Sequence, residues 1–261
     1  MSIISFENVS YIRDKKQILS DINWTVNPGE NWAVMGLNAS GKSSLIKLIM
    51  AEQWKTSGNL TVLGCEFGKD EIPALRQKIA IVGSFIAERF SAGIRAENLV
   101  YTGKFNSSML YKPFTDEELD EARELMRQVG AEKLIGKTYA NLSQGEKQLL
   151  LIARSLMIKP DILILDEATN GLDLFAKERL LDRLHEITKM PDAPTLLYIT
   201  HHPDEITEDF NKVLLLRRGV LIQAGNRDEI LTDDILSDFY ESPVNIQDFK
   251  GKRFVIPNKS L

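Results

Sequence analysis

The sequence has little of several features that would place it in particular protein classes. Among its 261 residues it has one cysteine, Cys65, so no disulfide can form within the chain, and we expect a reducing compartment. No apolar run approaches the roughly 18 residues that suggest a membrane span, and no charged-then-apolar signal pattern opens the chain. We therefore expect a cytoplasmic protein that reaches the inner face of a membrane only through partner subunits.

Basic residues are in the minority. The chain has 32 Lys and Arg against 37 Asp and Glu, which gives a formal net charge of -5. This balance argues against a general nucleic-acid surface, and we expect no nucleic-acid partner. Hydrophobic content of 43% and charged content of 26% are ordinary for a globular protein. The length suits one large α/β domain or a core with a lobe.

The eight residues Gly36–Ser43, GLNASGKS, match the phosphate-loop pattern G-x-x-x-x-G-K-[ST]. A strand-like apolar segment, Trp32–Met35, precedes them, and a helical run, Ser44–Met50, follows. A glycine-rich turn between a strand and a helix surrounds an anion with backbone N–H groups, and the helix dipole favours negative charge there. The alternative is a chance glycine-rich turn, which both flanks argue against. The sequence therefore predicts a nucleoside-triphosphate site.

We expect different residues of this loop to bind the phosphates and the metal ion. Lys42 can reach the β- and γ-phosphates, and the hydroxyl of Ser43 can ligate Mg²⁺. The predicted nucleotide-binding set comprises Gly36, Leu37, Asn38, Ala39, Ser40, Gly41, Lys42, Ser43 and Ser44.

Another apolar segment ends in two carboxylates. Ile162–Leu165 is followed by Asp166 and Glu167. A buried strand delivers such an acid to the carboxyl edge of the sheet, where ligands of α/β proteins bind. We expect Asp166 to orient Mg²⁺ through its water shell and Glu167 to polarise the attacking water. A solvated Asp-Glu pair is common at strand ends, so its weight comes from the phosphate loop in the same chain.

The segment Leu142–Glu146, LSQGE, precedes the helical run Leu149–Leu156. Ser143 and Gly145 then stand at a helix N-terminus, a second place suited to an anion. The alternative is a plain N-cap serine on a core helix. The order of the motifs, ending in a Thr-His pair at His201, favours the anion site.

In this order the motifs resemble those of the ATP-binding cassette (ABC) ATPase family, over about residues 2–225. LSQGE resembles the family's signature motif, commonly LSGGQ, and Asn170–Asp173 resembles its D-loop. His201 resembles its switch histidine, and Tyr11 resembles the aromatic residue that stacks on adenine.

That resemblance implies an enzyme that binds ATP and Mg²⁺ and hydrolyses ATP to ADP and phosphate. Its catalytic residues would be Glu167, His201 and Lys42, and its metal ligands Ser43 and Asp166. Outside the phosphate loop, the implied nucleotide contacts are Tyr11, Ser143, Gln144, Gly145, Glu146 and Asp173.

The resemblance further implies a head-to-tail dimer, either a homodimer or a cassette heterodimer. Each ATP would be held between Gly36–Ser43 of one chain and Ser143–Glu146 of the other. The function it implies is the energy-coupling ATP-binding subunit of an ABC transporter, with separate membrane subunits. One alternative is a soluble cassette ATPase that acts on a cytoplasmic partner. Another is a small-molecule kinase, which LSQGE and His201 disfavour because a kinase needs an acceptor pocket.

One position departs from the family pattern. A glutamine usually follows the strand that matches Ile79–Val82, where it touches Mg²⁺ and connects to the membrane partner, whereas here the matching residue is Ser84. This puts conventional coupling to a transporter in doubt and leaves ATP binding unaffected. Tyr101–Phe105 with Leu110 and Tyr111 most resembles soluble cassettes of the molybdenum-transport type.

Two groups of side chains each allow more than one interpretation. Because neighbouring residues on a strand face opposite ways, His201 and His202 are not expected to share a metal ion. An aromatic group is either core or an apolar docking face for a partner. It comprises Phe85, Phe90, Tyr101, Phe105 and Tyr111.

The predicted fold class is α/β: a phosphate-loop NTPase core, with a mixed sheet and flanking helices, an N-terminal antiparallel β part and an inserted helical subdomain. We expect an ATP-binding domain at residues 1–225, with the helical subdomain at about 84–160 and a C-terminal extension at 226–261. The helical pattern runs from about Thr115 to Leu156, and Thr115 with Glu118 predicts a capping box at its start.

Overall fold

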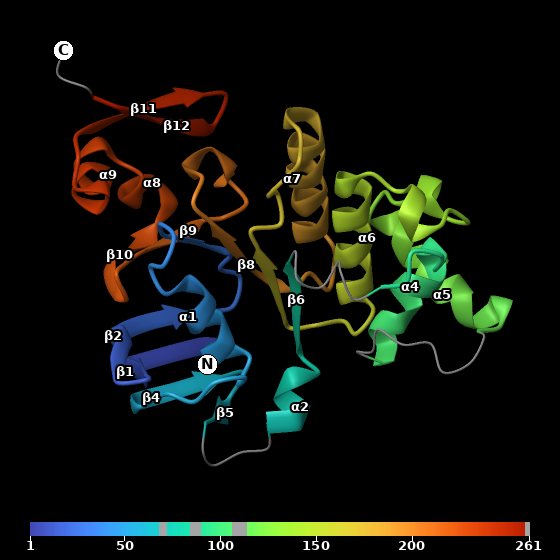
Figure 1. Cartoon of the computed structure of the whole chain (residues 1–261), viewed down its shortest axis with the longest axis horizontal. Helices are drawn as coiled ribbons and strands as arrows, with labels where there is room; N and C mark the ends of the chain where they lie inside the picture. Colours follow the sequence, from blue (N-terminus) through green and yellow to red (C-terminus); the bar gives the residue numbers. More distant parts are fainter. Residues whose placement is uncertain (68–71, 84–89, 106–113, 259–261) are drawn as a thin grey trace. The chain divides into compact units, whose positions relative to one another are not determined.

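The computed structural model describes residues 1–67, 72–83, 90–105 and 114–258. The chain divides into two compact units, one formed by residues 1–76 with 195–261 and the other by residues 77–194. Figure 1 labels their elements, and each unit is described by itself. No helix within the described ranges is both long enough and apolar enough to cross a membrane. The domain boundaries expected from the sequence remain a prediction.

The first unit opens with an antiparallel sheet in the strand order β2-β1-β4-β5 (Figure 1). Buried and exposed residues largely alternate along β1 and β2, as expected when one sheet face packs on a core. Phe6 and Trp24 lie on the buried side with their ring centroids 5.8 Å apart. The N-terminal antiparallel part is confirmed. Its strands are β1 (Ile4–Arg13), β2 (Lys16–Val26), β4 (Ser57–Val62) and β5 (Cys65–Glu66).

Further strands of this unit carry the phosphate loop. β3 (Trp32–Met35) pairs in parallel with β8 (Thr195–Thr200) and with β9 (Lys212–Arg217). β10 (Val220–Asn226) pairs antiparallel with β9. Every residue of β3 and β8 is buried, which fits parallel strands covered on both faces. α1 (Lys42–Ile49) follows β3, so the strand, loop and helix predicted from the sequence are confirmed.

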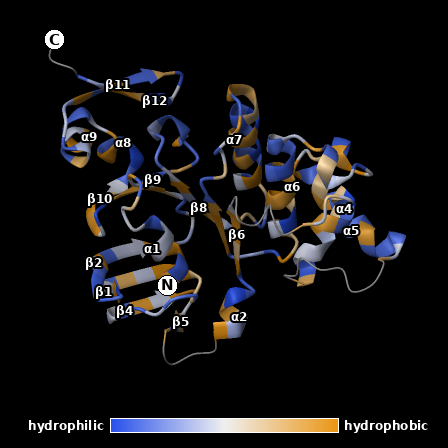
Figure 2. Ribbon diagram, in the orientation of Figure 1, coloured by the Kyte–Doolittle hydropathy of each residue, from blue (hydrophilic) through white to orange (hydrophobic). Residues whose placement is uncertain are grey.

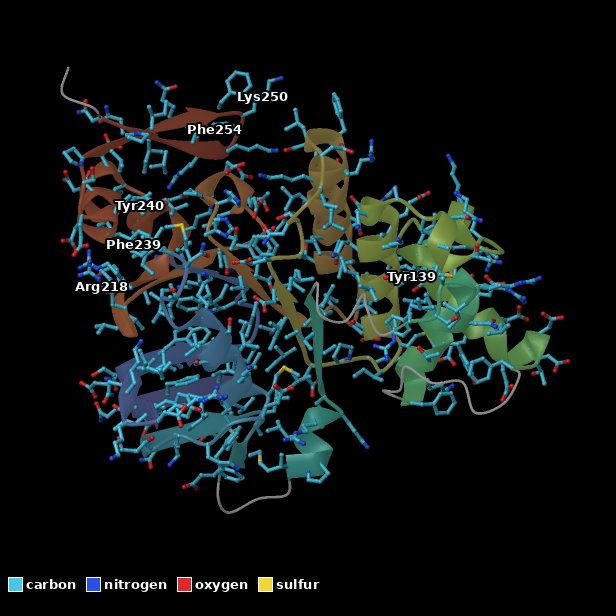
Figure 3. The ribbon with its side chains drawn as sticks, in the orientation of Figure 1. Tyr139, Arg218, Phe239, Tyr240, Lys250 and Phe254 are labelled. Carbon is cyan, nitrogen blue, oxygen red and sulfur yellow. The ribbon has the colours of Figure 1, made fainter. Side chains whose placement is uncertain are left out.

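Beyond β10 the first unit ends in two short helices and a hairpin. Figure 3 labels Phe239 and Tyr240 on α9, and Lys250 and Phe254 on the hairpin. Burial, with a smaller contribution from Asp204, raises the pKa of Tyr240 to about 12. These elements are α8 (Arg227–Ile230), α9 (Asp233–Tyr240), β11 (Val244–Phe249) and β12 (Lys252–Pro257). Two further short helices, α2 (Ile72–Arg76) and η4 (Pro203–Glu205), belong to the same unit.

The second unit combines a parallel strand pair with helices. β6 (Ile79–Gly83) pairs in parallel with β7 (Ile162–Asp166), and Figure 2 shows the hydrophobic colour along β6. The first four residues of β7 are fully buried. Helix α6 contacts β6, α4, α5 and α7. Among its described residues the helices are α4 (Ala96–Tyr101), η1 (Thr102–Phe105), α5 (Asp116–Gln128), η2 (Glu132–Leu134), η3 (Tyr139–Asn141), α6 (Gln144–Leu156) and α7 (Leu174–Thr188).

Local signals explain where α5 begins and ends. The Thr115 hydroxyl accepts a hydrogen bond from the Glu118 backbone N–H at 3.2 Å, and the Glu118 carboxylate accepts one from the Thr115 N–H at 2.9 Å. The predicted capping box is therefore confirmed. The continuous helical pattern to Leu156 was too coarse, because α5 ends at Gln128 and Gly130 adopts a φ of 72°.

Candidate nucleotide-binding site

The phosphate loop has a backbone that tolerates few side chains. A Cβ atom on Gly36 would lie 2.7 Å from the backbone oxygen of Leu216. Gly41 has a φ of 108°, a conformation that L side chains rarely adopt, and Ala39 is held at 63°. Such strained residues persist where the surrounding structure requires them and cluster at functional sites.

Lys42 places its ammonium group against the loop. Its Nζ donates to the backbone oxygen of Gly36 at 2.7 Å and to that of Leu37 at 3.2 Å. The side chain is buried, with 7% of the residue exposed. A positive charge is thus fixed inside the turn that is predicted to receive the phosphates.

The N-terminus of α1 has no side-chain cap, because Gly41 occupies the N-cap position. Its first-turn amides therefore lack the partner that Ser, Thr or Asp would supply. The Ser40 hydroxyl is buried at 3% exposure and has no hydrogen-bond partner among the described residues. A phosphate bound at the helix N-terminus would satisfy donors of this kind. The residues of the loop fit a triphosphate, and Ser43 is exposed for a metal ion.

Two more of the predicted contacts belong to the first unit. Tyr11 lies in β1 and is 8% exposed, so little of its ring is open to an adenine, and its role stays a prediction. His201 directly follows β8. The last residue of that strand, Thr200, accepts a hydrogen bond from the Gly36 N–H at 3.4 Å through its backbone oxygen. The strand that leads to His201 is therefore joined to the phosphate loop.

The expectation that His201 and His202 face opposite ways is wrong. Their ring centroids lie 3.9 Å apart, at an interplanar angle of 41°. The rule for strands does not apply, because β8 ends at Thr200 and both histidines follow it. In the described ranges no group of three or more His, Cys, Asp or Glu side chains could hold a metal ion.

In the second unit, the acidic pair stands at the end of β7. Asp166 is the last residue of the strand, and Glu167 adopts a left-handed φ of 49°. The Glu167 carboxylate accepts a hydrogen bond from the Asn170 side-chain amide at 2.6 Å. Asn170 also donates its backbone N–H to the Glu167 carbonyl at 3.0 Å. This turn fixes the direction of the carboxylate at the cost of a strained residue, which is typical of a functional position.

Ser143 is the N-cap of α6. Its hydroxyl accepts from the Glu146 N–H at 3.3 Å, and the Glu146 carboxylate accepts from the Ser143 N–H at 2.8 Å. This hydrogen bond from Ser143, with the ammonium of Lys137 at 3.2 Å, lowers the pKa of Glu146 below its usual range. Ser143 is therefore an N-cap, and the binding of an anion by this exposed serine stays a prediction.

The remaining signature and D-loop residues lie where α6 and α7 begin. A Cβ atom on Gly145 would lie 3.1 Å from the Cβ of Ala176, so the glycine allows the two helices to approach closely. Asp173 caps α7 by accepting from the Ala176 N–H at 2.8 Å. Gln144 is exposed at the first position of α6.

Sequence reasoning missed the cationic residues beside the signature. A hollow of about 460 Å³ is lined by Ser143, Gly145 and Glu146, and also by Arg179 and Arg183 of α7. The two arginines are four residues apart and so share one face of the helix. The four-residue spacing of Arg179 and Arg183 is the sequence signal from which this cationic face could have been predicted.

Some predicted positions lie outside the described residues: Ser84, Phe85, Leu110 and Tyr111. Of the aromatic group, Phe90 and Tyr101 are buried at 9% and 5% exposure, which places them in the core. Phe105 is 56% exposed and its ring centroid lies 5.6 Å from that of Tyr101. The molybdenum-type subgroup stays a prediction.

A strand, phosphate loop and helix with an uncapped N-terminus define a phosphate-loop nucleotide-binding protein. Comparison with known proteins narrows the class. The family model described as ABC transporter matches residues 19–170. The uncharacterized ABC transporter ATP-binding protein YmeB of Lactococcus lactis is 65% identical over 98% of this chain and 99% of its own length. A putative ABC transporter ATP-binding protein of Streptococcus mutans is 53% identical over 98% of both chains.

A solved structure agrees in fold. CbiO1 of Clostridium perfringens, described as part of the ABC transporter complex CbiONQ, superposes with a TM-score of 0.78 at 26% identity, over 91% of this chain and 93% of that one. The chain belongs to the ABC transporter family. It is an ATP-binding cassette ATPase of the type that couples ATP hydrolysis to transport.

Proposed function

We propose that Mg·ATP is bound and hydrolysed between two cassettes arranged head to tail, either two copies of this chain or this chain and a related one. Gly36–Ser43 of one cassette binds the triphosphate, and Ser143–Glu146 of the other contacts the γ-phosphate. The observation that carries this proposal is the uncapped N-terminus of α1 beside the buried Lys42 ammonium and the buried Ser40 hydroxyl. The helix N-terminus has no side-chain cap and the Ser40 hydroxyl has no hydrogen-bond partner among the described residues, so this place suits a bound anion.

Each predicted residue has one task in the reaction. Lys42 and the loop amides stabilise negative charge on the transferred phosphoryl group. Glu167, held by Asn170, orients the attacking water, and His201 contacts the γ-phosphate. Tyr11 is assigned to the adenine.

Ser43 and Asp166 would hold Mg²⁺, which, when bound, neutralises charge on the β- and γ-phosphate oxygens. Asp173 is assigned to the nucleotide as a contact from the D-loop. Its carboxylate also orients the start of α7, because it accepts a hydrogen bond from the Ala176 N–H.

ATP favours the closed dimer because it binds that state better than the open one, and only differential affinity shifts a population. Hydrolysis removes the γ-phosphate that Ser143 and His201 contact, and the dimer opens. Separate membrane subunits at the cytoplasmic face of the membrane would receive this motion. Co-purification of the chain with spanning subunits from detergent-solubilised membranes tests the last step, and isolation with a soluble partner alone would favour the non-transport alternative.

Substitution of Glu167 by Gln tests the catalytic assignment. We expect ATP turnover to fall by about 10² to 10⁴, because the amide cannot accept a proton from the attacking water. Steady-state phosphate release at saturating Mg·ATP measures the effect. Glu186→Gln, on α7 in the same unit, is the matched control and should keep the wild-type rate. Hydrolysis by Glu167→Gln at the wild-type rate would rule Glu167 out.

A further inference from the structure

A buried carboxylate lies close in sequence to the histidine that is assigned to the γ-phosphate. Glu205 is 2% exposed and ends the short helix η4, which begins two residues after His201. Its Oε2 accepts a hydrogen bond from the Thr200 hydroxyl at 2.5 Å and another from the Tyr198 hydroxyl at 3.0 Å. Both donors belong to β8 and are themselves buried, at 1% and 0% exposure.

These hydrogen bonds join the chain segment before His201 to the segment after it. Thr200 precedes the histidine and Glu205 follows it, so the contact between them closes the turn that contains it. The Thr200 hydroxyl also accepts a hydrogen bond from the backbone N–H of His202 at 3.0 Å. The Thr200 hydroxyl therefore donates to Glu205 and accepts from His202, and both of these partners belong to the turn.

The turn is closed by backbone hydrogen bonds as well. Glu205 donates its N–H to the His202 carbonyl at 3.2 Å, while the Thr200 carbonyl accepts from the Gly36 N–H at 3.4 Å. Tyr198 is held from its other side by Phe210, with their ring centroids 4.9 Å apart and an interplanar angle of 23°. The base of the turn is thus joined to the phosphate loop on one side and to the core on the other.

A carboxylate buried without polar partners would be costly, and the two hydroxyl hydrogen bonds reduce that cost. A plain packing role needs no acid here, since an apolar side chain would fill the same volume without a desolvation penalty. We propose that Glu205 is a positioning residue, which acts through Thr200 and the backbone of His202 to hold His201 in the orientation used for hydrolysis. This inference rests on the proposed role of His201.

Two substitutions of Glu205 separate its chemistry from its volume. Glu205→Gln keeps a carbonyl oxygen that can accept both hydroxyls, and we expect its kcat to stay within about threefold of wild type. Glu205→Met removes the acceptor, and we expect kcat to fall by about tenfold or more while KM for ATP changes by less than about threefold. Equal activity of Glu205→Met and wild type would contradict the proposal.

A double-mutant cycle with His201→Ala tests whether Glu205 acts through the histidine. Single-turnover hydrolysis with enzyme in excess measures the slow variants. We expect Glu205→Met to cause no further loss in the His201→Ala background. The matched control is Glu97→Met, which removes a carboxylate of 3% exposure in the other unit. We expect Glu97→Met to lower the rate of hydrolysis by the same factor in the His201→Ala background as in the wild type.

The outcomes separate the two proposals. His201→Ala at the wild-type rate would contradict the proposed role of His201, and the inference with it. If His201→Ala is impaired and the losses of Glu205→Met and His201→Ala multiply, the inference alone is wrong. Should Glu205→Met fail to fold, Thr200→Val removes the shared hydroxyl at nearly constant volume. We expect Thr200→Val to lower kcat in the wild-type background and to cause no further loss of rate in the His201→Ala background. Wild-type activity of Thr200→Val, or a double mutant whose loss is the product of the two single losses, would overturn the proposal.

Discussion

The two helices predicted to bind phosphate begin in opposite ways. α1, after the phosphate loop, has Gly41 as its N-cap and no side-chain cap, whereas α6, in the signature segment, has Ser143 as its N-cap and a complete capping box. The first helix therefore leaves its amides for a ligand, and the second satisfies part of its own N-terminus within the chain. The difference agrees with the proposal that the phosphate loop binds nucleotide by itself and that the signature contributes when another cassette is present.

Lys42→Ala is expected to have the largest effect, because it removes the charge held inside the uncapped site. A ligand at about 100 times its Kd stabilises a protein by about 2.7 kcal/mol, and we expect the variant to lose this stabilisation. Melting curves with and without Mg·ATP measure it. Lys47→Ala, in the last turn of the same helix, is the control and should keep the shift. An undiminished shift in Lys42→Ala would count against the assignment.

Ser143→Ala should show the reverse pattern. Loss of an N-cap costs about 1 kcal/mol, so the free energy of unfolding without nucleotide should fall by that amount. The nucleotide-dependent shift measured on dilute monomer should remain, because α1 is untouched. Denaturant unfolding and melting curves measure the two quantities, and Ser143→Thr is the control that keeps a capping hydroxyl. A lost nucleotide shift in dilute Ser143→Ala would break the distinction between the two helices.

Much of this difference could be predicted from the sequence because it is local. The phosphate loop occupies eight consecutive residues, and the capping boxes of Thr115 and Ser143 depend on a three-residue spacing. The predicted role of Glu167 follows from its place directly after an apolar strand, and that of His201 from the resemblance to the family.

Other features depend on contacts that no short pattern records. The close approach of the His201 and His202 rings follows from the residue at which β8 ends. The burial of Tyr11 depends on how its sheet packs. The contact of Glu205 with Tyr198 requires a strand and a turn to be placed together, and neither residue type marks it in the sequence.

The smallest effect concerns pH and the charge of the capping box. The pKa of Glu146 lies below its usual 4.5, because the hydrogen bond from Ser143 and the charge of Lys137 favour the ionised form. Its stabilising contribution is therefore present above about pH 4.5 and is lost as the pH falls through the lowered pKa.

Glu146→Gln should accordingly be less stable than wild type at pH 7, by a few tenths of a kcal/mol to about 1 kcal/mol. The difference should shrink as the pH falls below about 4.5. Urea unfolding at several pH values measures it, and Glu132→Gln in the neighbouring η2 turn is the control. A difference that does not change with pH would contradict the charge argument.

The central claim is that the nucleotide site is complete only when two cassettes meet, and the mass of the Glu167→Gln variant tests it most directly. Light scattering at assay concentration should give a monomer without nucleotide and a dimer at saturating Mg·ATP, because slow hydrolysis leaves the γ-phosphate in place. A variant that remains monomeric while its melting curve shows bound Mg·ATP would contradict the claim.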